Sequence, residues 1–386
     1  MSENIPKLRF PGFTELWEQR KLGELMESME YGLNASATQF DGENRYLRIT
    51  DIDDETRKYT GTNPVSPDVN LEKAENYALR EGDILFARTG ASVGKTYKYQ
   101  KEDGKVYFAG YLIRGRLKPK ENVDFIYQQT LTAEFSKFVK ATSQRSGQPG
   151  VNANEYSRYS VWAAPMEEAD RVGSLFEELD RRYTLHQRKL EHLKKLKSGL
   201  LQKMFPKDGE TIPEVRFPGF TGDWEQRKFK EVLTVSSGRD YKHLNEGDIP
   251  VYGTGGYMLS VDGALSWEND AIGIGRKGTI DKPYILKAPF WTVDTLFYSI
   301  PKQDFDLNFV FDLFQIIDWK LKDESTGVPS LSKTTIDKTQ VWVPSYEEQV
   351  AIGCTLATFD NLITLHQRKL DHLKRLKQGL LQQMFV

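Results

Sequence analysis

A glycine-rich turn is the first candidate for chemistry in this chain. Residues 90–96 read GASVGKT, close to a phosphate-binding loop, in which backbone amides and a lysine hold nucleotide phosphates. That loop needs four residues between its glycines, but only three separate Gly90 from Gly94. It also needs a helix directly after the threonine, whereas the residues after Thr96 alternate like a β-hairpin. We therefore reject a nucleotide site and expect a turn between strands.

The same segment has a counterpart in the second half of the chain. GDILFARTGASVGKTY at 82–97 parallels DAIGIGRKGTIDKPY at 270–284, and both predict a strand followed by an Arg-x-Gly turn. Such turns can present guanidinium and ammonium donors to phosphates or guanine edges. An equally open alternative is a solvated turn whose glycines serve only the backbone. The candidate DNA-binding residues are Arg88, Thr89, Ser92, Lys95, Arg145, Arg276, Lys277, Thr279 and Lys282.

Metal and catalytic chemistry find no support in the residue spacing. His186 and His192 lie six residues apart, as do His366 and His372, so on a helix each pair points to different sides and forms no metal face. A polar position that fixes helix register is the favoured role. Signatures of nucleases, hydrolases and adenine methyltransferases are missing, and the single Cys354 fits a reducing cytoplasm. We expect no catalytic, cofactor-binding or metal-binding residue.

Two internal repeats frame the chain. Residues 146–205 align without a gap with residues 326–385, and TLHQRKLEHLKKLKSGLLQKMF matches TLHQRKLDHLKRLKQGLLQQMF at 18 of 22 positions. RFPGFTELWEQRK begins at Arg9 and RFPGFTGDWEQRK begins at Arg216. The segments between these repeats are unlike. This pattern predicts two copies of one unit with divergent inserts, suited to recognising two unlike things at a fixed separation.

Each repeat ends in a predicted long helix. No proline interrupts 167–205, and a heptad of mostly apolar residues runs through both copies, which predicts an antiparallel coiled coil about 57 Å long at ~1.5 Å per residue. Ser345 and Glu348 form a capping box at the start of the second helix. Leu185, Leu196 and Leu201 make the apolar stripe of the helix wider than the seam of a single coiled coil. The predicted seam residues are Leu179, Tyr183, Leu190, Leu193, Leu200, Phe359, Ile363, Leu370, Leu373 and Leu380.

The segments between the repeats have a mixed pattern. Strands are predicted at 46–50, 83–88, 106–109, 271–275 and 283–286, and helices at 125–142 and 307–322. We therefore expect an α+β fold with two pseudo-twofold-related domains, separated by the two long helices. The predicted domains are 1–165 and 207–344, with the repeated long helices at 166–206 and 345–386.

Charge is unevenly distributed. Residues 181–205 hold eight Lys or Arg and one acid, and residues 361–386 hold five and one, so the rest of the chain is acidic within a total of −2. Any DNA surface on the modules is therefore a local basic strip. The basic faces of the long helices either contact DNA or are covered by a partner protein. The apolar stripe on these helices is wider than one coiled-coil seam needs, which favours a partner protein. No run of 18 apolar residues and no signal peptide is present, which predicts a cytoplasmic protein that does not bind membranes.

The repeated motifs resemble the specificity subunit of type I restriction-modification systems. The resemblance rests on RFPGF…WEQRKLGEL, GDILFARTGASVGKTY, VPSYEEQ and LHQRKL-x-HLK-x-LK-x-GLLQ-x-MF, and it covers the whole chain. One departure is MEEA at 166–169, where the second copy reads YEEQ.

The resemblance implies a non-catalytic DNA-recognition subunit. Each variable domain would read one half of a bipartite, asymmetric site in double-stranded DNA, and the helices would set the spacer. Two modification subunits would methylate adenine at N6 with S-adenosylmethionine, and restriction subunits would use ATP and Mg²⁺. Two alternatives from other classes are a coiled-coil scaffold with no DNA role and a stand-alone nucleic-acid enzyme.

Overall fold

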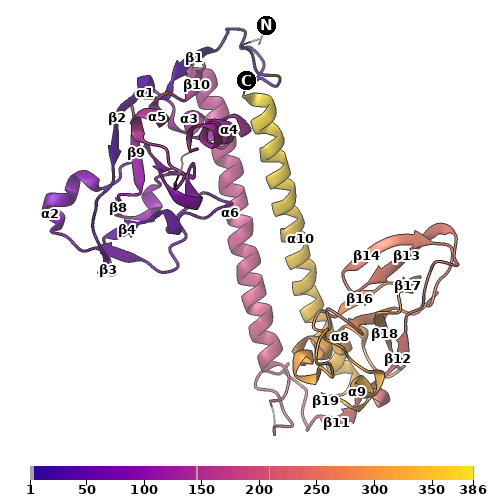
Figure 1. The fold of residues 1–386 in the computed structure, drawn as a ribbon. Coiled ribbons are helices and arrows are strands. Elements are labelled where there is room, and N and C mark those ends of the chain that lie inside the picture. The colour runs from indigo at the N-terminus through magenta and orange to yellow at the C-terminus, as the bar shows by residue number, and fades with distance from the viewer. Residues whose placement is uncertain (1–3, 145–146, 208, 386) are drawn as a thin grey trace. The chain divides into compact units, whose positions relative to one another are not determined.

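The chain folds into two compact units, each of which contains parts of both long helices. Unit 1 comprises Met1–Leu185 and Leu370–Val386, and unit 2 comprises His186–Lys369. The computed structural model describes residues 4–144, 147–207 and 209–385. In Figure 1, unit 1 runs from indigo to magenta with the yellow end of α10, and unit 2 runs from pink through orange to the yellow start of α10. The boundaries expected from sequence treat each long helix as a separate segment, whereas compactness assigns each half of a helix to the unit that it packs against.

Both units are built on a four-stranded antiparallel sheet with the same order. In unit 1 the order is β2 (Met26–Tyr31), β9 (Leu112–Leu117), β6 (Asp83–Ala87) and β7 (Thr96–Lys98). In unit 2 it is β12 (Leu233–Ser237), β18 (Leu296–Pro301), β15 (Ala271–Gly275) and β16 (Tyr284–Leu286). The inner strands β6 and β15 are buried along their whole length, as apolar runs without alternation require. The predicted strands at 83–88 and 271–275 are confirmed.

A second, unlike layer distinguishes the units. Unit 1 pairs β4 (Arg45–Leu47) with β8 (Val106–Phe108) and β3 (Ala37–Gln39) with β5 (Val65–Pro67). Unit 2 has a long hairpin of β13 (Glu246–Gly253) and β14 (Gly256–Val261), extended by β17 (Trp291–Thr292). The hairpin expected after Thr96 is wrong, because β7 pairs with β6 whereas β8 pairs with β4.

Two predicted helices are each broken in the structure. Residues 125–142 form α3 (Val123–Gln129) and α4 (Ala133–Thr142), because the Thr132 hydroxyl accepts the Phe135 N–H at 3.3 Å and starts a new helix. Residues 307–322 form α8 (Leu307–Ile316) and the 3₁₀ turn η5 (Trp319–Lys322). Shorter helices complete the units: α1 (Leu22–Leu25), α2 (Leu71–Ala74), α5 (Ala153–Ser157), α7 (Phe229–Val232) and α9 (Lys333–Lys338). The predicted α+β class is confirmed.

The two internal repeats, which we call the frame (residues 9–21 and 146–205 in the first copy, 216–228 and 326–385 in the second), form the same strand pair in each unit. β1 (Glu18–Lys21) pairs antiparallel with β10 (Ser160–Ala163), and β11 (Glu225–Lys228) pairs antiparallel with β19 (Gln340–Val343). Gln19 lies opposite Trp162, and Gln226 lies opposite Trp342, in matching register. The WEQRK motif and the strand before each long helix therefore close each module at its base.

The long helices are α6 (Met166–Lys203) and α10 (Tyr346–Met384), and they pack antiparallel inside each unit (Figure 1). In unit 1, Phe176 of α6 stacks on Phe385 directly after the end of α10. In unit 2, the end of α6 packs against Ile352 and Leu356 near the start of α10. Four predicted seam residues are buried (Leu179, Leu190, Leu193 and Leu370), and six are partly buried (Tyr183, Leu200, Phe359, Ile363, Leu373 and Leu380). Among the described residues, no helix has the length and apolar character to cross a membrane.

A buried ion pair ties the N-terminal motif of each repeat to its long helix. Arg9 Nε donates to Glu168 Oε1 at 2.5 Å, and Arg216 Nε donates to Glu348 Oε1 at 2.7 Å, with both carboxylates almost fully buried. The predicted capping box is half formed, since the Glu348 N–H reaches the Ser345 hydroxyl at 3.4 Å but the Glu348 carboxylate is taken by Arg216. The retained glutamates 168 and 348 thus stabilise the fold, and the MEEA departure leaves this contact intact.

Candidate nucleic-acid interface

The Arg-x-Gly turn of unit 1 is held between two distant segments. Arg88 follows β6, its N–H donates to the Tyr111 carbonyl at 3.0 Å, and its carbonyl accepts the Val151 N–H at 2.9 Å. The Gly90 N–H donates to the Pro149 carbonyl at 3.0 Å, and its φ of +72° is one that glycine adopts without strain. The turn is therefore fixed by backbone contacts to residues 109–111 and 148–151.

The turn of unit 2 has the same contacts. Arg276 follows β15, its N–H donates to the Thr295 carbonyl at 2.8 Å, and its carbonyl accepts the Leu331 N–H at 3.0 Å. The Gly278 N–H donates to Pro329 at 2.8 Å. Pro149 and Pro329 are equivalent positions of the 60-residue repeat. The parallel between Arg88 and Arg276 that the sequence predicts is thus present in three dimensions.

In each unit a fourth segment lies beside the turn, and its glycine comes very close to the backbone of another segment of the same chain. A Cβ on Gly32 would lie 2.1 Å from the Ala109 carbonyl oxygen, and one on Gly238 would lie 2.0 Å from that of Val293. We call these assemblies the recognition edges. They comprise 32–33, 88–90, 109–111 and 148–150 in unit 1, and 238–239, 276–278, 293–295 and 328–330 in unit 2.

The side chains on the two recognition edges differ. In unit 1 the Arg88 guanidinium lies 4.7 Å from the Tyr31 ring centre, and Tyr111 beside it is 63% exposed. In unit 2 the exposed Arg276 lies 5.9 Å from the Phe297 ring centre, with Lys277 next to it. An arginine that is oriented by an aromatic ring can donate two parallel hydrogen bonds to a guanine edge or to a phosphate.

Other predicted residues are less available. Lys95 is buried, and its ammonium group donates to the Ile52 carbonyl at 3.0 Å and pairs with Asp54 at 2.6 Å. Three of the predicted residues are half-buried (Thr89, Ser92 and Thr279), and two are exposed (Lys277 and Lys282). Arg145 lies outside the described residues. The DNA contacts of all these side chains stay predictions.

Buried polar groups support the unit 1 turn from below. The Tyr156 hydroxyl donates to the Ala87 carbonyl at 2.7 Å and accepts the Gly94 N–H at 3.1 Å, and burial raises the pKa of Tyr156. Thr96 begins a strand rather than a helix, which removes the helix N-terminus that a phosphate-binding loop requires. Among residues 4–144, 147–207 and 209–385, no three metal-ligating side chains converge.

Sequence analysis missed several residues of the recognition edges. Tyr111 and Gln148 lie on the edge in unit 1, with Tyr31 beside it under Arg88, and Thr295 and Val328 lie on the edge in unit 2. The retained prolines at 149 and 329 were an available signal, because they mark one rigid position in two repeats whose neighbours differ.

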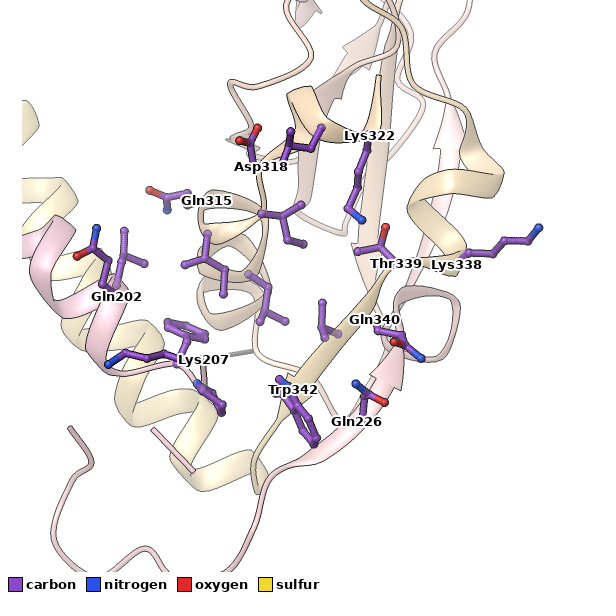
Figure 2. A pocket seen from close by; sticks show the side chains of 18 of the residues that line it. Gln202, Lys207, Gln226, Gln315, Asp318, Lys322, Lys338, Thr339, Gln340 and Trp342 are labelled. Atoms are coloured by element: carbon purple, nitrogen blue, oxygen red, sulfur yellow. The ribbon is translucent and has the colours of Figure 1, made fainter. Parts of the chain in front are cut away.

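Unit 2 also contains a large open cleft, of about 1360 Å³ (Figure 2). It lies among the end of α6, α8, η5, α9 and the strand pair β11–β19. The cleft contains none of the residues of the recognition edge.

Comparison with known proteins defines the class. The model of the type I restriction modification DNA specificity domain matches twice, at residues 14–195 and 221–375. A putative type I restriction enzyme MjaX specificity subunit from Methanocaldococcus jannaschii is 22% identical over 98% of this chain and 95% of its own length. The MjaVIII specificity subunit of that organism is 20% identical over 98% and 94%. The crystal structure of a type I S subunit from M. genitalium superposes with a TM-score of 0.76 at 16% identity, over 99% of both chains.

The chain therefore belongs to the type I restriction-modification DNA specificity family, with the DNA specificity domain present twice. It is a specificity subunit of such a system, as the sequence motifs predicted.

Proposed function

We propose that unit 1 and unit 2 each read one half of a bipartite, asymmetric site in double-stranded DNA. The observation that carries this proposal is the recognition edge, which is built twice from equivalent backbone contacts but carries unlike side chains. One backbone arrangement with two side-chain sets can place donors similarly on two different base sequences.

We propose further that α6 and α10 set the spacer between the half-sites. Their 38 and 39 residues correspond to about 57 Å at ~1.5 Å per residue. A helix pair is stiff, so the number of unspecified base pairs would depend on helix length and not on the modules.

The partners in this proposal are two modification subunits and the restriction subunits. Leu185 and Leu365 occupy equivalent repeat positions and are 60% and 45% exposed, and Leu196 and Leu376 are 43% and 40% exposed. Leucines exposed in both repeats support helix faces that a partner covers. The chain itself is non-catalytic in this scheme. The modification subunits use S-adenosylmethionine to methylate adenine N6, and the restriction subunits use ATP and Mg²⁺, in the cytoplasm.

The half-site assignment is tested by methylation with the modification subunit and the Arg88→Ala and Arg276→Ala variants. Each variant should weaken recognition of one half-site only, by about 1–3 kcal/mol for a lost bidentate base contact. Equal weakening on all DNA would make these arginines phosphate contacts, and no effect would make both turns solvated loops.

The spacer assignment is tested by inserting four residues after Leu193 and after Leu373. The insertion adds about 6 Å to each helix. Methylome sequencing should then show the same half-sites separated by one or two further base pairs, at ~3.4 Å each. An active complex with an unchanged spacer contradicts the proposal.

A further inference from the structure

The large cleft of unit 2 is lined by apolar and basic side chains among uncharged polar ones. Leu201, Ile316, Leu321 and Trp342 line it, and Ile316 and Leu321 are 40% and 85% exposed. Figure 2 shows Lys207, Lys322 and Lys338 around the opening, with Asp318 as the only acid among the lining residues. Exposed aliphatic side chains beside cations are typical of a surface that a partner covers.

Two of these lysines have no acidic partner among the residues that the structure describes. Lys207 pairs with Glu214 at 3.0 Å. Neither Lys322 nor Lys338 has a carboxylate within ion-pair distance among the described residues. Their positive charge is therefore available to a ligand, and an acidic group bound in the cleft would be attracted by both lysines.

Unit 1 has a smaller cleft at the equivalent place, of about 460 Å³. Six pairs of lining residues correspond across the repeats. The pairs are Gln19 with Gln226, Arg158 with Lys338, Tyr159 with Thr339, Ser160 with Gln340, Trp162 with Trp342, and Phe385 with Phe205. The repeated segments therefore form part of the cleft in both units, whereas Ile316, Leu321 and Lys322 come from the divergent segment of unit 2.

We propose that the cleft binds an acidic segment with apolar side chains along one face, carried by a protein subunit that binds this chain twice. The inference rests on the proposed function, in which the modification subunit is present in two copies. A protein segment fits better than DNA because exposed aliphatic side chains line the cleft, whereas a duplex presents phosphates and polar base edges. Unit 2 provides the tighter site, since its cleft is larger and has two lysines without an acidic partner among the described residues.

The test uses the full-length chain and the purified modification subunit of the same system. Lys322→Glu with Lys338→Glu reverses both free charges, and Leu321→Ser removes an exposed aliphatic side chain that contributes little to folding. Titration calorimetry should show subunit binding weakened by about tenfold or more in each case. The matched control, Lys230→Glu with Lys333→Glu, makes the same charge change at exposed residues that do not line the cleft, and should stay within about twofold of the unaltered chain.

Each result decides the matter. Unaltered affinity and two-subunit stoichiometry in both cleft variants overturns the inference while leaving the proposed function intact. Lost DNA binding by the chain alone, with subunit binding unchanged, also overturns it and makes the cleft a nucleic-acid surface. If the unaltered chain binds no modification subunit, the proposed function fails together with the inference.

Discussion

The two units place different third residues beside the same lysine–aspartate pair. In unit 1, Lys377 donates to Asp180 Oδ1 at 2.6 Å, and the Gln128 amide donates to Asp180 Oδ2 at 3.0 Å. In unit 2, Lys197 donates to Asp360 at 2.5 Å and to the Gln315 amide oxygen at 2.7 Å. Lys197 and Lys377 are repeat equivalents, as are Asp180 and Asp360.

The residue that corresponds to Gln128 in unit 2 is Asp312. Both lie three positions after the phenylalanine that packs on the frame tryptophan, Phe125 on Trp17 and Phe309 on Trp224. Asp312 is 1% exposed, and no atom of residues 4–144, 147–207 and 209–385 forms a hydrogen bond with its Oδ2. Burial raises the pKa of Asp312 to about 8, although Lys197 acts in the opposite direction. The frame thus keeps one ion pair, while the module supplies a neutral amide in one unit and a carboxyl that titrates near neutral pH in the other.

The largest expected effect comes from removing the lysine in each unit. Lys197→Met removes a buried lysine and leaves Asp360 without its cation beside the protonated Asp312, and it should destabilise unit 2 by about 2 kcal/mol. Lys377→Met removes a more exposed lysine beside a neutral amide, and should cost unit 1 about 1 kcal/mol. Hydrogen exchange read by mass spectrometry separates the two units. Equal losses would mean that Asp312 does not matter to the comparison.

The next effect is the pH dependence of unit 2. Folded Asp312 keeps its proton up to about pH 8, whereas an unfolded aspartate ionises near pH 4, so its contribution is complete below pH 4 and is lost as pH rises towards 8. Unit 2 should therefore lose about 2 kcal/mol or more of unfolding free energy between pH 5 and pH 8.

Two substitutions test whether Asp312 causes this pH dependence. Asp312→Asn should flatten the slope of unit 2, and Gln128→Glu should introduce a similar slope into unit 1. Urea unfolding monitored by hydrogen exchange at pH 5, 6.5 and 8 provides the measurement. A slope that survives in Asp312→Asn would assign it to another group.

A smaller difference concerns the frame tryptophans. Trp17 Nε1 donates to the buried Glu168 carboxylate at 2.8 Å, whereas Trp224 Nε1 has no hydrogen-bond partner within the described part of the chain. Trp17→Phe should cost about 2 kcal/mol, because a charge-assisted hydrogen bond is lost, and Trp224→Phe should cost about half as much, from packing alone. Thermal unfolding of the two variants decides this, and a larger loss in Trp224→Phe would reverse the predicted order.

The smallest effect is expected at a histidine pair in unit 2. His186 Nδ1 and His366 Nδ1 lie 2.9 Å apart and are repeat equivalents. Burial, His186 and the nearby Lys189 and Lys369 lower the pKa of His366, so its contribution is present above pH 6.5 and is lost as pH falls below it. His366→Leu should reduce this acid-side loss in unfolding midpoints between pH 7.5 and 5.5. The matched control is His372→Leu at an exposed position, which should leave the loss unchanged.

The repeats and the long helices were determined by the sequence alone. A proline-free heptad is a local pattern, and it predicted a helix over 167–205 where α6 spans Met166–Lys203. The matched positions of Arg88 and Arg276 were also readable, because both follow a buried strand and precede a glycine. The α+β class and the family resemblance followed from the same local signals.

Only the tertiary structure decided which distant groups meet. Lys95 was predicted as a surface donor, but its ammonium is held by Ile52 and Asp54, which lie about 40 residues earlier. The break between α3 and α4 depends on the Thr132 cap, which competes with continued helix at a position where local propensity allows either. The recognition edge joins four segments through backbone hydrogen bonds, which carry no residue signature. The environment that raises the pKa of Asp312 likewise exists only when α6, α8 and α10 pack together in unit 2.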